Sequence, residues 1–352
     1  MSFRQHYKNN QLETLSSKPI KNNYTAKVSV IVLVYNVEAY IERCARSLFE
    51  QTLDLIEYIF INDCSPDHSM EILRNVICEY PNRQSQIHII NHIENMGAAY
   101  SREEGIKFAN GEYIIHCDSD DWTDIDMYRK MYTMAKEKNN DIVICDWYET
   151  DGVNHEIVYQ NLNEKQDLIQ GVIKRSISGS LWNKLISQSL YKKVSEFPRA
   201  HMMEDVCYSV QILVENKRSI GHISQPLYYY YNNKSSICHH PSDASCLERC
   251  KQSCVNIDTI IHFLRSRNLE DKYKNEIVIL KNSARVFIWG LYMRDPRKYR
   301  SIWRSVYPEI NKTYPFTKGI RRTLSIIFFL ANLGLYPYML KIFNIFKGFR
   351  KV

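Results

Sequence analysis

Apolar runs alternate with amphipathic segments along residues 27–147 of the chain. Residues 27–36 form a continuous β-branched run, KVSVIVLVYN, which is typical of a strand buried on both faces. Residues 37–52 then carry apolar side chains at helical spacing and predict a helix. The same pattern predicts further strands and helices in alternation: strands at 56–63, 86–91, 112–122 and 141–147, and helices at 69–82, 97–111 and 127–140. Strands alternating with helices imply right-handed crossovers, so we expect an α/β fold with a Rossmann-like, doubly wound, mostly parallel sheet.

The sequence divides into three parts. Residues 1–26 are polar and are expected to form a flexible leader. Residues 27–240 are expected to form the α/β domain, with a first half at 27–125 and a second half at 126–240. Residues 241–352 have mostly helical periodicity, which predicts a helical C-terminal region.

The positive charge of the chain is concentrated at its C-terminal end. The formal net charge is +7, yet residues 310–352 hold eight basic and no acidic side chains, which leaves about −1 for the rest. Such a local excess favours an anionic membrane surface, and not nucleic acid, as a partner. Residues 323–340 carry no charge and have basic neighbours on both sides. We expect a basic amphipathic tail that lies in the membrane interface; a helical hairpin packed on the body and a membrane span are the alternatives.

Ten cysteines are scattered through the chain, and the N-terminus lacks the apolar core of a signal peptide. We therefore expect free thiols in the reducing cytosol, and a protein that is peripheral on the inner face of the cell membrane. Cys246, Cys250 and Cys254 recur at helical spacing, with His239 and His240 upstream. A buried stripe of small side chains is the favoured interpretation, and a zinc site is the alternative, although no paired CxxC spacing is present.

Polar side chains follow three of the predicted strands at the point where each strand ends. The first strand ends at residues 34–36 (VYN), the second at residues 62–67 (NDCSPD), and another at residues 118–121 (DSDD). In a parallel sheet these ends lie side by side, at the edge where ligands bind. Clustered carboxylates are costly unless a cation neutralises them, and Mg²⁺ or Mn²⁺ carrying a diphosphate would fit. Singly, each motif could be a turn, a helix cap or a polar loop, but their joint occurrence favours a site.

Longer segments around these strand ends carry a family resemblance. They read VSVIVLVYNVEAYIERCARSLFEQT, IFINDCSPDHS and NMGAAYSREEGIKFANGEYIIHCDSDD, in that order along residues 28–121. Three later segments belong with them: SLWNKLI at 180–186, FPRAHMMEDVCYSVQIL at 197–213 and PLYYYYNNKSSIC at 226–238. In order and spacing the chain resembles glycosyltransferase family 2 of the bacterial type, whose members have the GT-A fold. The resemblance covers residues 27–240 and is strongest in the first hundred of these.

Carried over residue by residue, the resemblance implies a nucleotide-sugar site at the strand ends. In it, the VYN side chains lie against the base, Asp63 contacts uracil or ribose, Asp118 faces the ribose and Asp120 ligates Mn²⁺ or Mg²⁺ on the diphosphate. The implied site comprises Val34, Tyr35, Asn36, Asp63, Arg102, Asp118, Ser119 and Asp120. The family often has ARN where this chain has SRE at 101–103, so any contact made by that asparagine is in doubt. Arg102 would lie near the nucleotide, and a surface salt bridge is its alternative role.

A second acidic group, Glu204 and Asp205, precedes an amphipathic segment. An inverting sugar transfer needs one base within hydrogen-bond reach of the acceptor hydroxyl, and a carboxylate suits that role when burial or a like charge raises its pKa. By resemblance, Asp205 is the expected base and Glu204 a contact to the donor or acceptor sugar. A capping pair at a helix N-terminus is the alternative, and the two roles are compatible.

The acceptor side of the site is less well defined by the sequence. Trp182, Asn183 and Lys184 are expected to line the floor of the acceptor cleft, because an indole stacks well on a sugar; a core tryptophan is the alternative. Asp121 is a further candidate for a sugar contact. His239 is a candidate for an additional metal or phosphate contact, against an ordinary surface-loop histidine.

These observations favour one function over its rivals. We expect an inverting, metal-dependent glycosyltransferase that moves a sugar from a nucleotide-diphosphate donor, a UDP-sugar, to a hydroxyl of a glycan or lipid-linked acceptor in bacterial surface polysaccharide synthesis. A dinucleotide enzyme or a nucleotidyltransferase would need a glycine-rich phosphate loop, which the first strand end lacks. A non-catalytic glycosyltransferase-like subunit of a membrane assembly, binding nucleotide or glycan, is the remaining alternative.

Overall fold

The computed structural model describes residues 26–162, 166–232, 242–312, 329–333 and 335. The chain forms two compact units, each built from three segments. The first, here called the sheet unit, comprises 1–164, 180–194 and 212–234. The second, here called the helical unit, comprises 165–179, 195–211 and 235–352.

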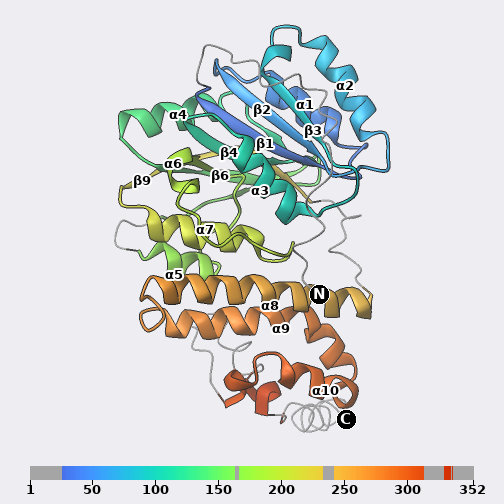
Figure 1. The fold of residues 1–352 in the computed structure, drawn as a ribbon, viewed down its shortest axis with the longest axis vertical. Helices are drawn as coiled ribbons and strands as arrows, with labels where there is room; N and C mark the ends of the chain where they lie inside the picture. Colours follow the sequence, from blue (N-terminus) through green and yellow to red (C-terminus); the bar gives the residue numbers. More distant parts are fainter. Residues whose placement is uncertain (1–25, 163–165, 233–241, 313–328, 334, 336–352) are drawn as a thin grey trace, which may run out of the picture. The chain divides into compact units, whose positions relative to one another are not determined.

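The sheet unit contains a single sheet in the described residues, with the strand order β3-β2-β1-β4-β8-β6-β9-β5 and with β7 paired to β6 (Figure 1). Strands β3, β2, β1 and β4 are mutually parallel, and β9 is parallel to β6. The bounds are β1 Val28–Val34, β2 Ile56–Asn62, β3 Ile87–Asn91, β4 Tyr113–Asp118, β5 Trp122–Thr123, β6 Ile142–Thr150, β7 His155–Val158, β8 Lys184–Ser187 and β9 Ile220–Tyr231. The predicted α/β class with a mostly parallel, doubly wound sheet is therefore confirmed.

Three strands, β5, β7 and β8, depart from the parallel pattern, since β5 is antiparallel to β9 and β7 to β6. Strand β8 lies between β4 and β6 and is antiparallel to both. It comes from the SLWNKLI segment, in which the sequence predicted no strand. Because β8 is antiparallel to both of its neighbours, β6 is parallel to β4. Strands β1, β2 and β4 are parallel to one another, so their carboxyl ends lie at one edge of the sheet.

Helices cover both faces of this sheet. The helices of the sheet unit are α1 Ile41–Phe49, α2 Ser69–Glu79, α3 Ala98–Phe108, α4 Met127–Glu137 and α6 Gln188–Tyr191, with the 3₁₀ turn η2 Gln84–Gln86. One face of β1, with Val30 and Val32, packs in a core shared with α1, α2 and α4. On the other face, α3 approaches so closely that a Cβ on Gly105 would lie 2.7 Å from Cγ2 of Ile31. Each fully buried aliphatic side chain of this kind contributes about 1.5–3 kcal/mol, so both faces stabilise β1.

The helical unit confirms the predicted helical C-terminal region. Its elements are α5 Leu168–Ile173, the start of α7 Glu204–Glu215, α8 Asp243–Ser266, α9 Lys274–Arg294, α10 Pro296–Ser305 and the 3₁₀ turn η3 Pro308–Lys312. Helices α8 and α9 lie side by side (Figure 1). Helix α10 begins with Pro296 in its first turn, and the Asp295 carboxylate accepts hydrogen bonds from the next two free amides.

Part of the predicted membrane tail is visible in this unit. Within residues 329–333, Ala331 and Asn332 are fully buried, and the Asn332 side chain accepts a hydrogen bond of 3.0 Å from the Trp303 indole N–H and another from Arg285. For Ala331 and Asn332 the structure favours the packed alternative over a position in the membrane interface. In the part of the chain that the structure covers, no helix is long and apolar enough to span a bilayer.

Candidate active site

The ends of β1 and β2 form two loops that are bonded to each other. Asn36 and Cys64 have positive φ angles of 55° and 56°, an uncommon conformation for residues other than glycine. The Asn36 amide donates to Oγ of Ser65 at 2.8 Å, which joins the two strand ends. Val34 is fully buried, whereas Tyr35 and Asn36 are exposed, so the last two side chains of VYN face solvent.

Asp67, which the sequence analysis quoted but gave no role, fixes this pair of loops. Its carboxylate accepts hydrogen bonds of 2.6 Å from the hydroxyls of Ser65 and Ser69, and one of 2.8 Å from the Glu38 amide. Burial alone would raise the pKa of Asp67, but these hydrogen bonds outweigh it and lower the pKa to about 2. The carboxylate is therefore charged at neutral pH, and it holds the Glu38 amide of the first loop together with Ser65, whose hydroxyl oxygen accepts from the Asn36 amide.

Asp63 lies at the end of β2 and is 5% exposed. Its Oδ1 accepts hydrogen bonds from the Met96 amide at 2.7 Å and lies 2.8 Å from Nδ1 of His92, while Oδ2 accepts from the Gly97 amide at 2.9 Å. The carboxylate thus joins β2, the end of β3 and the N-terminus of α3. A contact from Asp63 to a nucleotide remains a prediction, because most of its surface already faces these protein groups.

The acidic motif after β4 separates into exposed and buried carboxylates. Asp118 and Asp120 are partly exposed, whereas Ser119 is buried. Asp121 is 1% exposed and accepts 2.7 Å hydrogen bonds from the Tyr228 hydroxyl and the Tyr231 amide. Burial and the neighbouring carboxylates of Asp118 and Asp120 raise the pKa of Asp121. The expected sugar contact by Asp121 is thus corrected: this side chain holds β9 against the β4 end.

Arg43 of α1, which the sequence analysis missed, reaches the same loop. Its Nη2 donates to the backbone carbonyl of Asp120 at 3.0 Å, and its guanidinium carbon lies 3.7 Å from the centre of the Trp122 ring. Burial lowers the pKa of Arg43, against the opposing effect of Tyr231 and the nearby acids. No spacing in the sequence could reveal this contact, since the two residues are 77 positions apart.

Three residues expected to line the acceptor cleft are instead part of the core. Trp182, Asn183 and Lys184 are 5%, 0% and 3% exposed. The Trp182 ring stacks on Tyr228 with a centroid distance of 4.4 Å, and the Asn183 amide donates to the carbonyl of Cys145 at 3.2 Å. The alternative of a core tryptophan is therefore the correct one, because a buried ring has no face left for a sugar.

Replacing Trp182 with Ala is expected to lower the free energy of unfolding by about 3–5 kcal/mol, because the stack and its buried area are lost. Chemical denaturation measures this change, with Tyr159→Ala as a control because Tyr159 is 56% exposed. If Trp182→Ala kept its free energy of unfolding but had a raised KM for the acceptor, Trp182 would line the acceptor cleft after all.

Arg102 lies on α3 and is buried. Burial, and secondarily the charge of Arg102, lower the pKa of the fully buried His116. The adjacent Glu103 pairs with Lys107. Because Arg102 is buried, a surface salt bridge is not its role. A position of Arg102 near the nucleotide stays a prediction.

Glu204 and Asp205 form the first turn of α7, as the capping interpretation predicted. Glu204 is buried and Asp205 partly buried. Met203, directly before them, has a positive φ of 68°. Such a conformation in a long side chain is strained, and strain of this kind is concentrated at functional sites.

Asn256 of α8 holds the segment that leads into α7. It is fully buried, and its side-chain amide donates to the carbonyls of Ala200 at 2.6 Å and Met202 at 2.7 Å while its oxygen accepts from the Arg199 amide at 2.9 Å. One side chain thus satisfies three backbone groups of a segment without regular structure. The sequence analysis missed Asn256. The only signal in the sequence is its place among the buried positions of α8, which recur at helical spacing.

No cluster of three or more His, Cys, Asp or Glu side chains suited to a metal occurs among the described residues. Two partly exposed carboxylates, Asp118 and Asp120, still suit Mg²⁺ or Mn²⁺, which use one or two carboxylates together with phosphate oxygens and water. His239 lies outside the described residues. Cys246 and Cys250 are buried on α8, which agrees with the buried-stripe interpretation.

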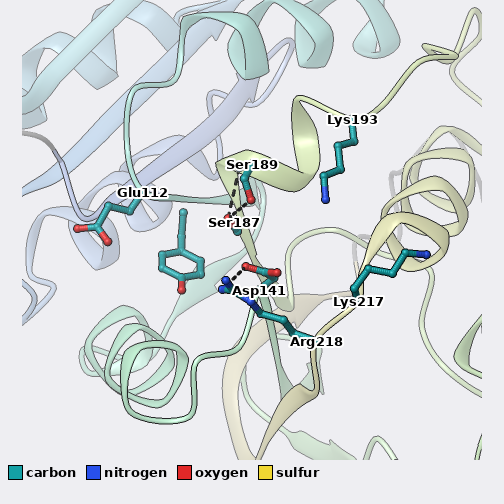
Figure 2. Close-up of a pocket in the computed structure, with 8 residues that line it drawn as sticks. Glu112, Asp141, Ser187, Ser189, Lys193, Lys217 and Arg218 are labelled. Carbon is teal, nitrogen blue, oxygen red and sulfur yellow. Dashed lines mark hydrogen bonds and ion pairs between the residues drawn. The ribbon is translucent and has the colours of Figure 1, made fainter.

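A cavity of about 380 Å³ lies at the opposite edge of the sheet, where β4, β6 and β9 begin. Figure 2 shows Arg218 paired with Asp141, with an Nη1–Oδ1 distance of 3.0 Å, and Lys193 across from them. The lining residues are Glu112, Tyr113, Asp141, Ser187, Ser189, Lys193, Lys217 and Arg218. The cavity lies at Tyr113, where β4 begins, whereas the acidic loop lies at Asp118, where β4 ends. Six residues of strand span roughly 17 Å, so the cavity is separate from the acidic loop.

Comparison with known proteins identifies the family. The chain matches the Glycosyl transferase family 2 model over residues 29–198. It is 32% identical over 264 residues to the putative glycosyltransferase EpsH of Bacillus subtilis, covering 72% of this chain and 73% of EpsH. It is 27% identical over 302 residues to a cholesterol galactosyltransferase of Borreliella burgdorferi, covering 78% and 80% of the two chains.

A solved structure supports the same assignment at the level of the fold. The chain is similar to S. aureus TarS 1–349 in complex with UDP-GlcNAc, with a TM-score of 0.65, 17% identity and 88% of each chain covered. This similarity establishes the GT-A fold, as the strand order and the acidic loop after β4 suggested. By its sequence, the chain belongs to glycosyltransferase family 2 and is a glycosyltransferase.

Proposed function

We propose that this glycosyltransferase is inverting and metal-dependent, and that it takes its sugar from a UDP-sugar. The observation that carries the proposal is the edge of the sheet unit, where the partly exposed Asp118 and Asp120 lie at the end of β4, beside the bonded ends of β1 and β2. A diphosphate with a divalent cation is the ligand class that such an edge accommodates. The UDP-GlcNAc named for the TarS complex supports a uridine donor.

The residues of the chain have distinct parts in this mechanism. The loops at the ends of β1 and β2, fixed by Asp67, bind the nucleoside, Asp118 faces the ribose, and Asp120 would hold the metal on the diphosphate. Mn²⁺ or Mg²⁺ bound there would offset the charge that develops on the leaving nucleoside diphosphate. Asp205 accepts the proton of the acceptor hydroxyl as that oxygen attacks the anomeric carbon, and Glu204 contacts a sugar.

We further propose a hydroxyl of a glycan or lipid-linked molecule as the acceptor, in bacterial surface polysaccharide synthesis at the cytoplasmic face of the membrane. The relative named as a cholesterol galactosyltransferase supports a lipid acceptor. The eight basic side chains of residues 310–352 support an anionic membrane surface as the setting.

Thermal unfolding with nucleotides tests the donor site. We expect the melting temperature of the full chain to rise with UDP in Mn²⁺ more than with GDP, CDP or dTDP, to return to baseline in EDTA, and not to rise with NAD. A ligand at a hundred times its Kd stabilises by about 2.7 kcal/mol, which raises Tm by several degrees. The absence of any shift would instead support a non-catalytic subunit.

A further inference from the structure

His92 directly follows β3, and its side chain is 6% exposed. Its ring lies between two carboxylates: Nδ1 is 2.8 Å from Oδ1 of Asp63, and Nε2 is 2.6 Å from Oε2 of Glu104. Asp63 comes from the end of β2 and Glu104 from α3, so the ring joins both elements to β3. The ring also meets the Tyr100 ring in an edge-on arrangement, with a centroid distance of 5.6 Å.

Each ring nitrogen lies at hydrogen-bond distance from a carboxylate oxygen, and this arrangement favours the charged form of the ring. A neutral imidazole has one N–H, whereas an imidazolium has two, so only the charged form donates to Asp63 and Glu104 together. Burial by itself would lower the pKa of His92, but the hydrogen bonds and charges of Glu104 and Asp63 outweigh it, and the pKa is raised above 6.5. Above that pKa, one ring nitrogen turns a lone pair toward a carboxylate oxygen.

We propose that His92 is a positioning residue for the nucleotide end of the donor site, acting in its charged form through Asp63. The Asp63 carboxylate accepts hydrogen bonds from the amides of Met96 and Gly97. The orientation that His92 imposes on this carboxylate therefore also fixes the position of the N-terminus of α3. This inference rests on the proposed donor site. It predicts that affinity for the donor nucleotide falls as pH rises through the titration of His92, because the neutral ring can no longer donate to Asp63 and Glu104 together.

Glu104→Gln is the variant that separates positioning from simple packing. Glutamine keeps an oxygen for the Nε2–H bond but removes one of the two charges that favour the imidazolium. The midpoint of the pH profile for nucleotide binding should therefore move to lower pH. At pH values between the two midpoints, Glu104→Gln should bind the nucleoside diphosphate identified by thermal shift with a Kd roughly tenfold above that of the wild-type protein. This is the usual size of the effect when a residue that supports a ligand contact is changed. On the acidic side of both midpoints the two proteins should bind alike.

Glu71→Gln is the matched control. Glu71 also pairs with a histidine, at 3.2 Å from Nδ1 of His68, but both side chains are more than 70% exposed. The same chemical change there should leave the pH profile of nucleotide binding unchanged.

The free energy of unfolding against pH gives a second measurement that needs no nucleotide. Because the folded pKa of His92 is raised, its contribution to stability is complete below the unfolded pKa of about 6.5 and is lost as pH rises through the folded pKa. In Glu104→Gln this loss should begin at lower pH. His92→Ala can fail to fold, which is why the charge variant is the primary test.

The outcomes are distinct. If the wild-type protein binds a nucleotide but its affinity has the same pH profile in Glu104→Gln, the positioning role is wrong while the proposed function stands. If only the stability profile moves, His92 is structural and the proposal is again overturned. If no nucleoside diphosphate binds at any pH, the proposed function itself is wrong, and the positioning role is wrong with it.

Discussion

Replacing Asp205 with Asn is expected to lower kcat for sugar transfer by about 10²–10⁴-fold, the usual range for loss of a general base. An asparagine keeps the size of the side chain but cannot accept the acceptor's proton. Asp205 lies in the first turn of α7, after the strained Met203, so its position should survive the substitution. Steady-state transfer rates at saturating donor and acceptor measure the effect.

The affinity for the nucleotide should not change in this variant, because the base acts on the acceptor. Asp271→Asn provides a control in the same helical unit, since Asp271 is exposed. Undiminished transfer by Asp205→Asn would remove the base assignment and leave Asp205 with its helix N-terminal role alone.

Replacing Asp120 with Asn should abolish the Mn²⁺-dependent thermal shift and lower kcat/KM for the donor by about 10²–10³-fold. The reason is that one of the two partly exposed carboxylates after β4 loses its charge, while the loop itself stays in place. Its backbone is held separately: the Asp120 carbonyl accepts from Arg43. Binding of the nucleotide with Mn²⁺ and with EDTA measures the loss directly.

Asp54→Asn is a matched control in the sheet unit, because Asp54 is exposed and far from β4 in the sequence. It should leave both the shift and the kinetics unchanged. Full metal dependence in Asp120→Asn would mean that the cation is held elsewhere, and the assignment of Asp120 would be withdrawn.

The strand–helix alternation was predictable because each element of residues 27–147 carries its own periodicity. The buried run of β1 and the spacing in α1 are local properties of the chain, and the parallel order of these strands follows from short crossovers. Strand β8 was not predictable in this way. Its four residues form a strand only because β4 and β6 lie on either side of it.

The candidate site was predictable at the level of segments and less so at the level of side chains. Asp120 and Asp121 are adjacent and identical, yet one is partly exposed and the other bonds Tyr228, more than a hundred positions away. Trp182 suited a sugar as well as a core, and only its stack on Tyr228 decides between them. The bonds that place Asp67 and His92 likewise join residues from different loops, which no local pattern records.

The three hydrogen bonds of Asn256 bear on how members of this family could be recombined. To exchange the C-terminal region between relatives, an obvious junction lies after the last strand, near residue 234, where the last segment of the sheet unit ends. Such a chimera would keep the native segment 199–202 but replace the α8 asparagine that holds it. A hybrid should therefore inherit the segment before α7 and helix α8 from the same parent, with residues 195–211 and 235–352 exchanged as one cassette.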